Sequence, residues 1–212
     1  MNKVQLLTLG TSLMGAAAVT SSAQATLLNF DDVTSSSYYQ ISQGSPTTYD
    51  GLVWYAPDND IGIVNPLGFY NIGSLSQVAG RAGYGYANGM VSGPNVMDIG
   101  DGSSVSAISG QMFDFNSGYF TPAWNDNVTI TLNGYNQGNL IDTTSFTLNS
   151  ESPTLETFNW TGLTEVVFNN NADTPFICAD NLAFNLTEVP EPATLAMGAA
   201  GAAVLVLLRR KK

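Results

Sequence analysis

The sequence contains no histidine at any of its 212 positions. Histidine is the base of Ser-His-Asp and Cys-His enzymes and a common zinc ligand, so its absence excludes those catalytic centres and His-bearing zinc sites. The single cysteine, Cys178, excludes a disulfide framework within the chain. No glycine-rich loop leads into a helix that carries a lysine, so the sequence offers no phosphate cradle.

Positive charge is also scarce in the body of the chain. Of the six Lys and Arg side chains, all but Arg81 lie near the two ends, whereas sixteen of the seventeen acidic residues lie between those ends. Such a body repels phosphate backbones, which excludes nucleic acid as a partner. An acidic surface suits solubility outside the cell, or the binding of divalent cations.

The first 25 residues have the order of a secretory signal peptide. Lys3 provides a short positive region, residues 4–19 are largely apolar, and the alanines Ala23 and Ala25 fit an A-x-A cleavage site. We therefore predict a signal helix over residues 1–25, export, and a mature chain that begins at Thr26.

Residues 189–212 combine a proline block, an apolar stretch and a basic end. The two prolines remove backbone donors and fix φ, so no element of the preceding domain can run through them. Residues 193–208 carry no charge and span roughly 24 Å as a helix, short of a hydrocarbon core of about 30 Å. We predict a transmembrane helix that serves as a temporary anchor, with its basic end on the cytoplasmic side. The block consists of Val189, Pro190, Glu191 and Pro192, and the basic end of Arg209, Arg210, Lys211 and Lys212.

This order of parts resembles the PEP-CTERM sorting signal of Gram-negative bacteria. In that family a membrane protease-transpeptidase, exosortase, reads the tail, cuts near the Pro-Glu-Pro and releases or re-attaches the protein. The resemblance implies an exosortase-type protease as a partner, transient membrane contact, and a destination at the cell surface or in the polysaccharide matrix. A plain C-terminal anchor is the alternative. A GPI signal fits less well, because neither a small-residue cleavage site nor a polar spacer is evident.

Residues 26–188 have the size of one domain and the pattern of an all-β fold. In residues 127–133 the apolar side chains of Val128, Ile130 and Leu132 alternate with polar ones, which indicates a half-buried strand. Residues 58–89 are glycine-rich and show no clear strand or helix pattern, and we expect an irregular loop over residues 80–86. The spacing favours an antiparallel two-sheet β-sandwich, most like a jelly roll. The other predicted strands are 27–30, 38–42, 52–55, 90–91, 96–99, 104–108, 111–115, 119–121, 140–148, 155–160, 165–168 and 176–186.

Residues 119–186 also resemble the carbohydrate-binding-module type of jelly roll. They contain Trp-Asn-Asp, an alternating strand, a glycine turn, a second strand, Phe-Asn-Trp-Thr-Gly, Val-Val-Phe and Ala-Asp-Asn-Leu, in that order. That fold often holds a structural calcium between an acid after the first strand and an aspartate on the last strand. The resemblance therefore implies a calcium site of Asp31 or Asp32 with Asp180.

The parity of Asp180 supports this calcium site. Cys178 and Leu182 have the same parity, so the carboxylate of Asp180 is expected on an apolar face, where a charge needs a partner or a metal. There are two alternatives. A bulge turns Asp180 outward, or hydrogen bonds satisfy its carboxylate.

Exposed aromatic side chains are candidates for sugar binding, because sugars stack on aromatic faces. Trp124, beside Asn125 and Asp126 in a predicted loop, is the preferred ligand residue. Trp54 and Trp160 are predicted to fill the core. The aromatic candidates are Trp54, Tyr55, Tyr84, Tyr86, Trp124 and Trp160.

Acid–base catalysis by two carboxylates is the enzyme chemistry that remains. The candidate pairs are Asp98 with Asp101 and Glu151 with Glu156, but both lie in turn-like sequence where solvated acids are common. We therefore predict no catalytic residues. The predicted function is that of an exported, exopolysaccharide- or biofilm-associated surface or matrix protein with a structural or binding role. A carbohydrate-binding module is the first alternative and a carboxylate-based glycoside hydrolase the second.

Overall fold

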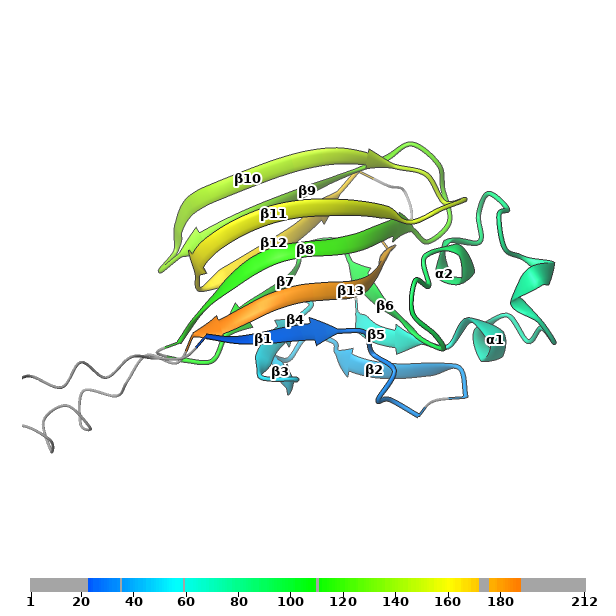
Figure 1. Cartoon of the computed structure of the whole chain (residues 1–212), viewed down its shortest axis with the longest axis horizontal. Helices are drawn as coiled ribbons and strands as arrows, with labels where there is room; N and C mark the ends of the chain where they lie inside the picture. The colour runs from blue at the N-terminus through cyan, green and yellow to red at the C-terminus, as the bar shows by residue number, and fades with distance from the viewer. Residues whose placement is uncertain (1–22, 35, 59, 110, 172–175, 188–212) are drawn as a thin grey trace, which may run out of the picture.

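The computed structural model describes residues 23–34, 36–58, 60–109, 111–171 and 176–187. Within these residues, thirteen strands form two antiparallel sheets that pack face to face (Figure 1). The predicted all-β, two-sheet architecture is therefore confirmed. Most of the predicted signal helix and the whole predicted transmembrane helix lie outside the described residues.

The first sheet has seven strands, with β13 at its centre and β11 and β2 at its edges. β1 pairs with the C-terminal half of β13, on the side where β6 pairs with the N-terminal half. The strands in order are β11 (Thr154–Leu163), β8 (Met112–Pro122), β13 (Phe176–Thr187), β6 (Val96–Gly100), β5 (Ile61–Val64) and β2 (Tyr38–Ser42), with β1 (Ala23–Leu28) beside β13.

The second sheet has six strands, with β10 and β3 at its edges. Its alternation follows the sequence pattern: Val128, Ile130 and Leu132 of β9 are all buried, and the residues between them are partly exposed. The strands in order are β10 (Asn139–Leu148), β9 (Val128–Asn136), β12 (Glu165–Asn170), β7 (Ser103–Ala107), β4 (Leu52–Tyr55) and β3 (Thr47–Tyr49).

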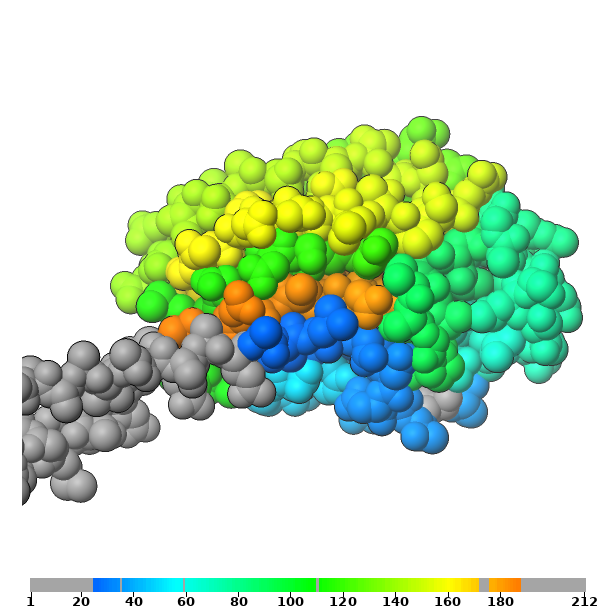
Figure 2. Space-filling view, viewed as in Figure 1, coloured from blue at the N-terminus to red at the C-terminus, as the bar shows by residue number. Residues whose placement is uncertain are grey.

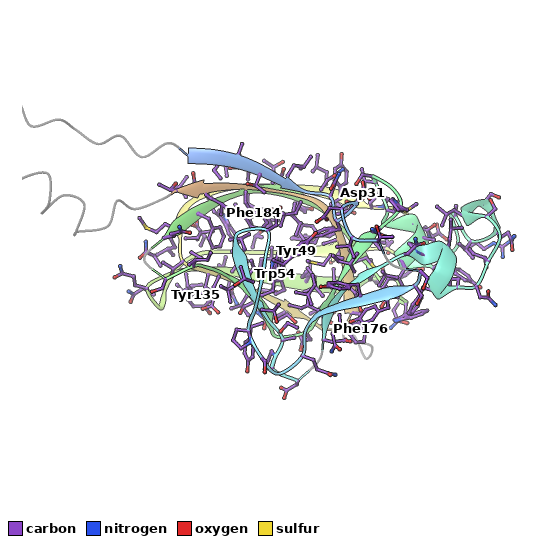
Figure 3. All side chains as sticks on the ribbon, turned by 90° about the horizontal axis from the view of Figure 1, so that it is seen from below. Asp31, Tyr49, Trp54, Tyr135, Phe176 and Phe184 are labelled. Carbon is purple, nitrogen blue, oxygen red and sulfur yellow. The ribbon has the colours of Figure 1, made fainter. Side chains whose placement is uncertain are left out.

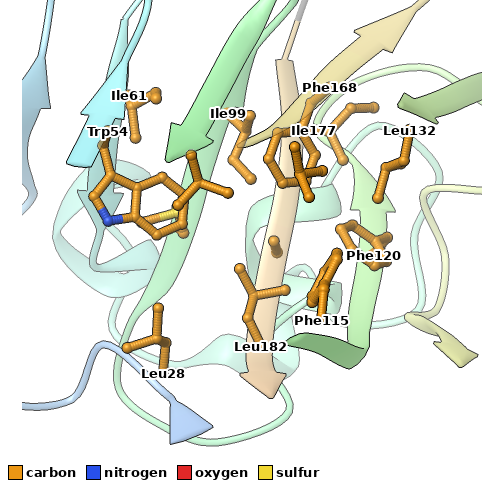
Figure 4. Close-up of a cluster of buried hydrophobic side chains, with 14 of the residues drawn as sticks. Leu28, Trp54, Ile61, Ile99, Phe115, Phe120, Leu132, Phe168, Ile177 and Leu182 are labelled. Atoms are coloured by element: carbon orange, nitrogen blue, oxygen red, sulfur yellow. The ribbon is translucent and has the colours of Figure 1, made fainter. Parts of the chain in front are cut away.

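The main core fills the space between the two sheets. Phe115 and Phe184 stack there with ring centroids 4.6 Å apart, and Phe120 and Leu132 lie beside them (Figure 4). Trp54, which Figure 3 shows between the sheets with Phe184, has no exposed surface. Trp160 is 9% exposed. The prediction that Trp54 and Trp160 are core residues is confirmed.

Several predicted strand limits were wrong. Residues 111–115 and 119–121 belong to one strand, β8, because Gly118 lies within the strand rather than at a break. A Cβ on Gly118 would lie 2.5 Å from Leu182 Cδ2, so the Leu182 side chain would have to shift to admit any other residue there. The short strands β3 and β5 were not predicted, and residues 90–91 are not a strand.

The two ends of the sandwich differ. Ala23, at the start of β1, pairs with Thr187, at the end of β13, so the sorting segment continues from this end (Figure 1). The opposite end carries residues 65–95, which connect β5 to β6 and form a protruding teal-green region in Figure 2. This segment contains α1 (Pro66–Phe69), a 3-10 turn at Leu75–Gln77, and α2 (Gly85–Asn88).

Candidate functional site

Residues 65–95 cover part of the outer face of the first sheet. Successive residues of a strand point to opposite faces. Met97 of β6 and Ile177 of β13 belong to the core between the sheets, so their neighbours Val96 and Cys178 point outward. Tyr86 of α2 packs on these two residues. The segment therefore builds a second, smaller apolar cluster on the outside of the sheet.

Local sequence explains how the segment folds and docks. Asn65 caps α1, accepting hydrogen bonds from the backbone N–H groups of Leu67 and Gly68, and Pro66 occupies the first turn. Gly85 begins α2 and donates its N–H to the carbonyl of Ala123 at 3.0 Å. A Cβ on Gly85 would lie 1.8 Å from the carbonyl oxygen of Pro122, so only glycine allows this approach.

Five rings meet where this segment joins the loop after β8. We call them the aromatic cluster: Phe69, Tyr70, Tyr84, Tyr86 and Trp124. Tyr86 lies at its base, 2% exposed, with ring centroids 5.0 Å from Phe69 and 5.3 Å from Trp124. Phe69 is 40% exposed, and Tyr70, Tyr84 and Trp124 are half-buried. The cluster thus presents several partly exposed rings on a buried support.

A buried carboxyl group fixes the base of the aromatic cluster. The hydroxyl of Tyr86 donates to Asp98 Oδ1 at 3.0 Å, and Asp98 is 4% exposed. Burial raises the pKa of Asp98 well above its ordinary value; the hydrogen bond from Tyr86 lowers it, and the nearby charge of Asp60 raises it further. Burial likewise raises the pKa of the Cys178 thiol, which pairs with Asp98 across the strands. These buried groups support the rings from below.

A hydrogen-bond network holds the loop that carries Tyr84. Asn88 accepts a hydrogen bond from Gly80 N at 2.6 Å and donates through Nδ2 to the carbonyls of Arg81 and Ser150. Ser150 Oγ accepts from Gly83 N at 2.7 Å and donates to Asp126 Oδ1 at 2.7 Å. Because Asn88 is 9% exposed and Ser150 is fully buried, the loop is fixed against the turn between β10 and β11.

The structure brings together three of the six aromatic residues proposed for sugar binding. Trp124, Tyr84 and Tyr86 belong to the aromatic cluster, although Tyr86 is buried. Sequence reasoning missed Phe69 and Tyr70, which lie in the part of the glycine-rich segment to which it assigned no element. The Asn-Pro pair before them is a helix-start signature that could have placed both rings on a short helix.

The parity argument for Asp180 was wrong, because β13 contains a bulge. Asn181 has a positive φ of 50°, and the pairing with β8 shifts register after Asp180. Cys178 therefore faces the outer cluster, whereas Leu182 beyond the bulge faces the main core. Asp180 has the parity of Cys178, and its partners lie in the outer segment.

Hydrogen bonds satisfy the buried carboxylate of Asp180. The N–H groups of Val91 and Ser92 each donate to Oδ2 at 2.7 Å, and Asn181 N donates to Oδ1 at 2.7 Å. Asp31 Oδ1 instead accepts from Asn95 N at 3.4 Å, and Asp32 Oδ1 from the Tyr49 hydroxyl at 2.7 Å.

These positions bear on the predicted calcium site. No group of three or more His, Cys, Asp or Glu side chains that could hold a metal occurs among the described residues. Asn95 Oδ1 is buried near Asp31 and accepts no hydrogen bond from any residue that the structure describes. The carboxylate of Asp180, in contrast, already accepts hydrogen bonds from backbone N–H groups. As arranged, Asp31, Asp32 and Asp180 do not fit one calcium ion. Calcium binding stays a prediction.

The two carboxylate pairs considered for catalysis occupy different settings. Asp98 is buried beneath Tyr86, and Asp101 Oδ1 accepts from Asn170 N at 2.7 Å. Glu151 is exposed in the turn after β10, and Glu156 is half-buried on β11. Neither pair has a geometry that assigns a catalytic role.

The predicted signal-cleavage site lies at the start of the described residues, and the predicted sorting tail lies beyond their end. Ala23 and Ala25 lie in β1, so cleavage after Ala25 would leave Thr26–Leu28 of that strand paired with β13. The sorting block and the basic end lie outside the described residues. Among the residues described, no helix is long and apolar enough to cross a membrane.

Comparison with known proteins identifies the tail. Residues 188–212 match the PEP-CTERM protein-sorting motif, which confirms the resemblance seen in the sequence. A motif of this kind implies exosortase processing of an exported precursor that is transiently anchored in the membrane. No curated protein matches the chain.

Solved structures similar to this chain include sugar-binding domains. The CBM22-1 xylan-binding domain of Paenibacillus barcinonensis Xyn10C is 9% identical with a TM-score of 0.38, and the match covers 81% of this chain and 99% of that domain. The arabinose-bound α-L-arabinofuranosidase MgGH51 is 10% identical with a TM-score of 0.39, and the match covers 76% of this chain and 26% of that enzyme. TmCBM61 in complex with β-1,4-galactotriose is 9% identical with a TM-score of 0.31, and the match covers 61% of this chain and 82% of that domain. With TM-scores below 0.5, these similarities carry no argument about this chain's fold or ligand.

Proposed function

We propose that this protein is an exported surface or matrix component that binds glycans through the aromatic cluster. The observation that carries the proposal is the set of partly exposed rings, led by Phe69 and Trp124, on a buried support. Partly exposed aromatic faces bind the apolar faces of sugars, and neighbouring polar groups fix the orientation of the hydroxyls. Asn125 and Asp126, beside Trp124, are suited to that second role.

The position of the aromatic cluster supports the proposal. It lies at the end of the sandwich that carries α1 and α2, whereas Thr187, from which the sorting motif continues, lies at the other end (Figure 1). A protein held by its tail would therefore present the cluster away from the point of attachment. That arrangement suits contact with extracellular polysaccharide before or after exosortase releases the tail.

A glycan array probed with the full-length protein in a sugar-free detergent tests the proposal. We expect binding that Trp124→Ala and Phe69→Ala weaken at least about tenfold, which corresponds to about 1.4 kcal/mol. Tyr39→Ala is the matched control, because Tyr39 is 51% exposed on β2 and lies outside the aromatic cluster. Binding that all three variants reduce equally, or no binding at all, would refute the proposal.

A structural matrix role is the second candidate, and the edge strand β10 favours it. β10 has ten residues, ends the second sheet, and exposes Leu140 (54%) and Ile141 (47%). A long open edge can pair with another chain. Light scattering should then show a mass that rises with protein concentration and falls to that of a monomer in Ile141→Lys. A concentration-independent monomer would exclude this role.

A further inference from the structure

Arg81 is the single lysine or arginine among the described residues. It lies between Gly80 and Gly83 on the loop that carries Tyr84, in a domain otherwise rich in acidic residues. The same loop contacts the Trp124 segment, since a Cβ on Gly83 would lie 3.2 Å from the carbonyl oxygen of Trp124. The one cation of the domain is thus placed beside the aromatic cluster.

The loop is built so that the backbone of Arg81 is fixed and its side chain is left to solvent. The Arg81 carbonyl accepts from Asn88 Nδ2 at 2.8 Å and from Tyr84 N at 3.3 Å, and its N–H donates to the carbonyl of Val78 at 3.2 Å. Gly80 and Gly83 have positive φ values of 71° and 79°, which make this tight turn possible. The Arg81 side chain is exposed. A fixed backbone lowers the entropy lost when an arginine binds a ligand.

We infer that Arg81 recognises an anionic substituent, a carboxylate or a sulfate ester, on a glycan whose neutral sugars stack on the aromatic cluster. This inference rests on the proposed function and names its ligand class. A guanidinium donates two parallel N–H bonds to a carboxylate or sulfate. The aromatic rings supply contact area, and Arg81 supplies the selection for charge.

The charges around the site limit how many anionic groups the ligand carries. Asp126 adjoins the cluster, and hydrogen bonds from the Ser150 hydroxyl and N–H lower the pKa of Asp126, which keeps it ionised. Glu151 follows Ser150 and is exposed. A densely charged polyanion would meet these carboxylates and the acidic body, with one arginine to offset them. The ligand class is therefore a largely neutral polysaccharide with scattered anionic groups.

Pairs of glycans that share a backbone test this inference with the full-length protein in sugar-free detergent. The pairs are xylan with glucuronoxylan and galactan with lightly sulfated galactan, and polygalacturonate is the densely charged probe. We expect wild type to bind the anionic member of a pair at least about tenfold more tightly. Arg81→Gln should abolish this preference, and Arg81→Lys should keep part of it. Salt at 0.5 M should also weaken the preference, because dissolved ions screen the attraction between Arg81 and the anionic group.

Each result decides between the inference and the function on which it rests. Equal binding of both members of the pairs, or a preference that survives Arg81→Gln, overturns the inference and leaves the glycan-binding function standing. Tightest binding of polygalacturonate overturns the assignment to scattered charges. The inference would also be wrong if Arg81→Gln lost binding to neutral glycans while its melting temperature stayed unchanged. Arg81 would then contribute to the binding of every glycan and not only to the recognition of anionic groups. Absence of binding to every glycan, neutral or charged, refutes the proposed function as well.

Discussion

The core between the sheets and the outer layer at residues 65–95 both contain many aromatic side chains, but they are built differently. In the core, Phe184 of β13 contacts the rings of both Phe113 and Phe115 of β8, and all three are buried between the sheets. In the outer layer, Tyr86 is held by a hydrogen bond to Asp98, and Asn88 ties the loop together. The first region depends on apolar burial and the second on a few directional contacts.

This difference separates stability from function. Fully burying one large apolar side chain contributes about 1.5–3 kcal/mol, so the core carries most of the folding free energy. The outer layer buries less, leaves rings partly exposed and fixes them by hydrogen bonds that each contribute about 0.5–1.5 kcal/mol. A site of this kind can vary its rings and loops without loss of the fold. Substitutions in the core should therefore cost more stability than substitutions in the outer layer.

Phe115→Ala should cost the most. Phe115 is fully buried and touches the rings of Phe158 and Phe184, each with a centroid distance of 4.6 Å. Removing the ring leaves a cavity, and we expect a loss of about 3–5 kcal/mol in the free energy of unfolding, measured by urea denaturation. A loss below about 1 kcal/mol would show that the core between the sheets does not dominate stability.

Asn88→Ala should cost less stability and more binding. The substitution removes the hydrogen bonds that Asn88 makes with Gly80 N–H and with the carbonyls of Arg81 and Ser150. We expect a loss of about 1–3 kcal/mol in urea denaturation and at least about tenfold weaker glycan binding. Asn139→Ala, at the exposed first residue of β10, is the control and should change neither. Unchanged glycan affinity in Asn88→Ala would show that the fixed loop is not needed for the site.

Asp180 should make stability fall as pH rises between about 4 and 6. Burial raises the pKa of Asp180 to about 6, although hydrogen bonds from Ser92, Val91 and Asn181 oppose this. An unfolded aspartate titrates near about 3.9, so within this window the folded state binds more protons and loses stability as they dissociate.

Asp180→Asn tests this pH dependence. The variant should reduce the fall in unfolding free energy across the window by about 1–2 kcal/mol, a figure lowered for partial solvent screening. Denaturation at pH 4, 5, 6 and 7 measures it. The pKa of Asp98 is also raised, so Asp98 likewise makes stability fall as pH rises. Part of the pH dependence of the unfolding free energy should therefore remain in Asp180→Asn. An identical pH profile in wild type and variant would contradict the prediction.

Trp124→Ala should affect stability least. Its ring is half-buried and packs on Tyr86 and Phe69. We expect a loss of about 1 kcal/mol together with the loss of glycan binding proposed above. A loss of about 3 kcal/mol or more would instead make Trp124 a core residue, and the distinction between the two regions would no longer hold.

Much of the sandwich could be predicted from local pattern. The limits of β2 and β4 match the predicted ranges, and β9 and β10 differ by a few residues at their ends. Errors arose where packing overrides pattern. Gly118 resembles a break in the sequence but lies inside β8, where it pairs with Glu156 of β11. The bulge at Asn181 reverses the faces of β13, and one residue of shift moves every later side chain to the other side.

Three features could be inferred from local residue order alone: the C-terminal sorting signal, the all-β class and the buried faces of the regular strands. These depend on local order: an apolar stretch beside a proline block and a basic end, or a period of two along one strand. The tertiary structure decided the site. Phe69 and Trp124 lie far apart in the chain, and their rings meet because Gly85 lets α2 approach Ala123. No periodicity encodes such a contact, since it depends on how two irregular segments pack on the outer face of a finished sheet.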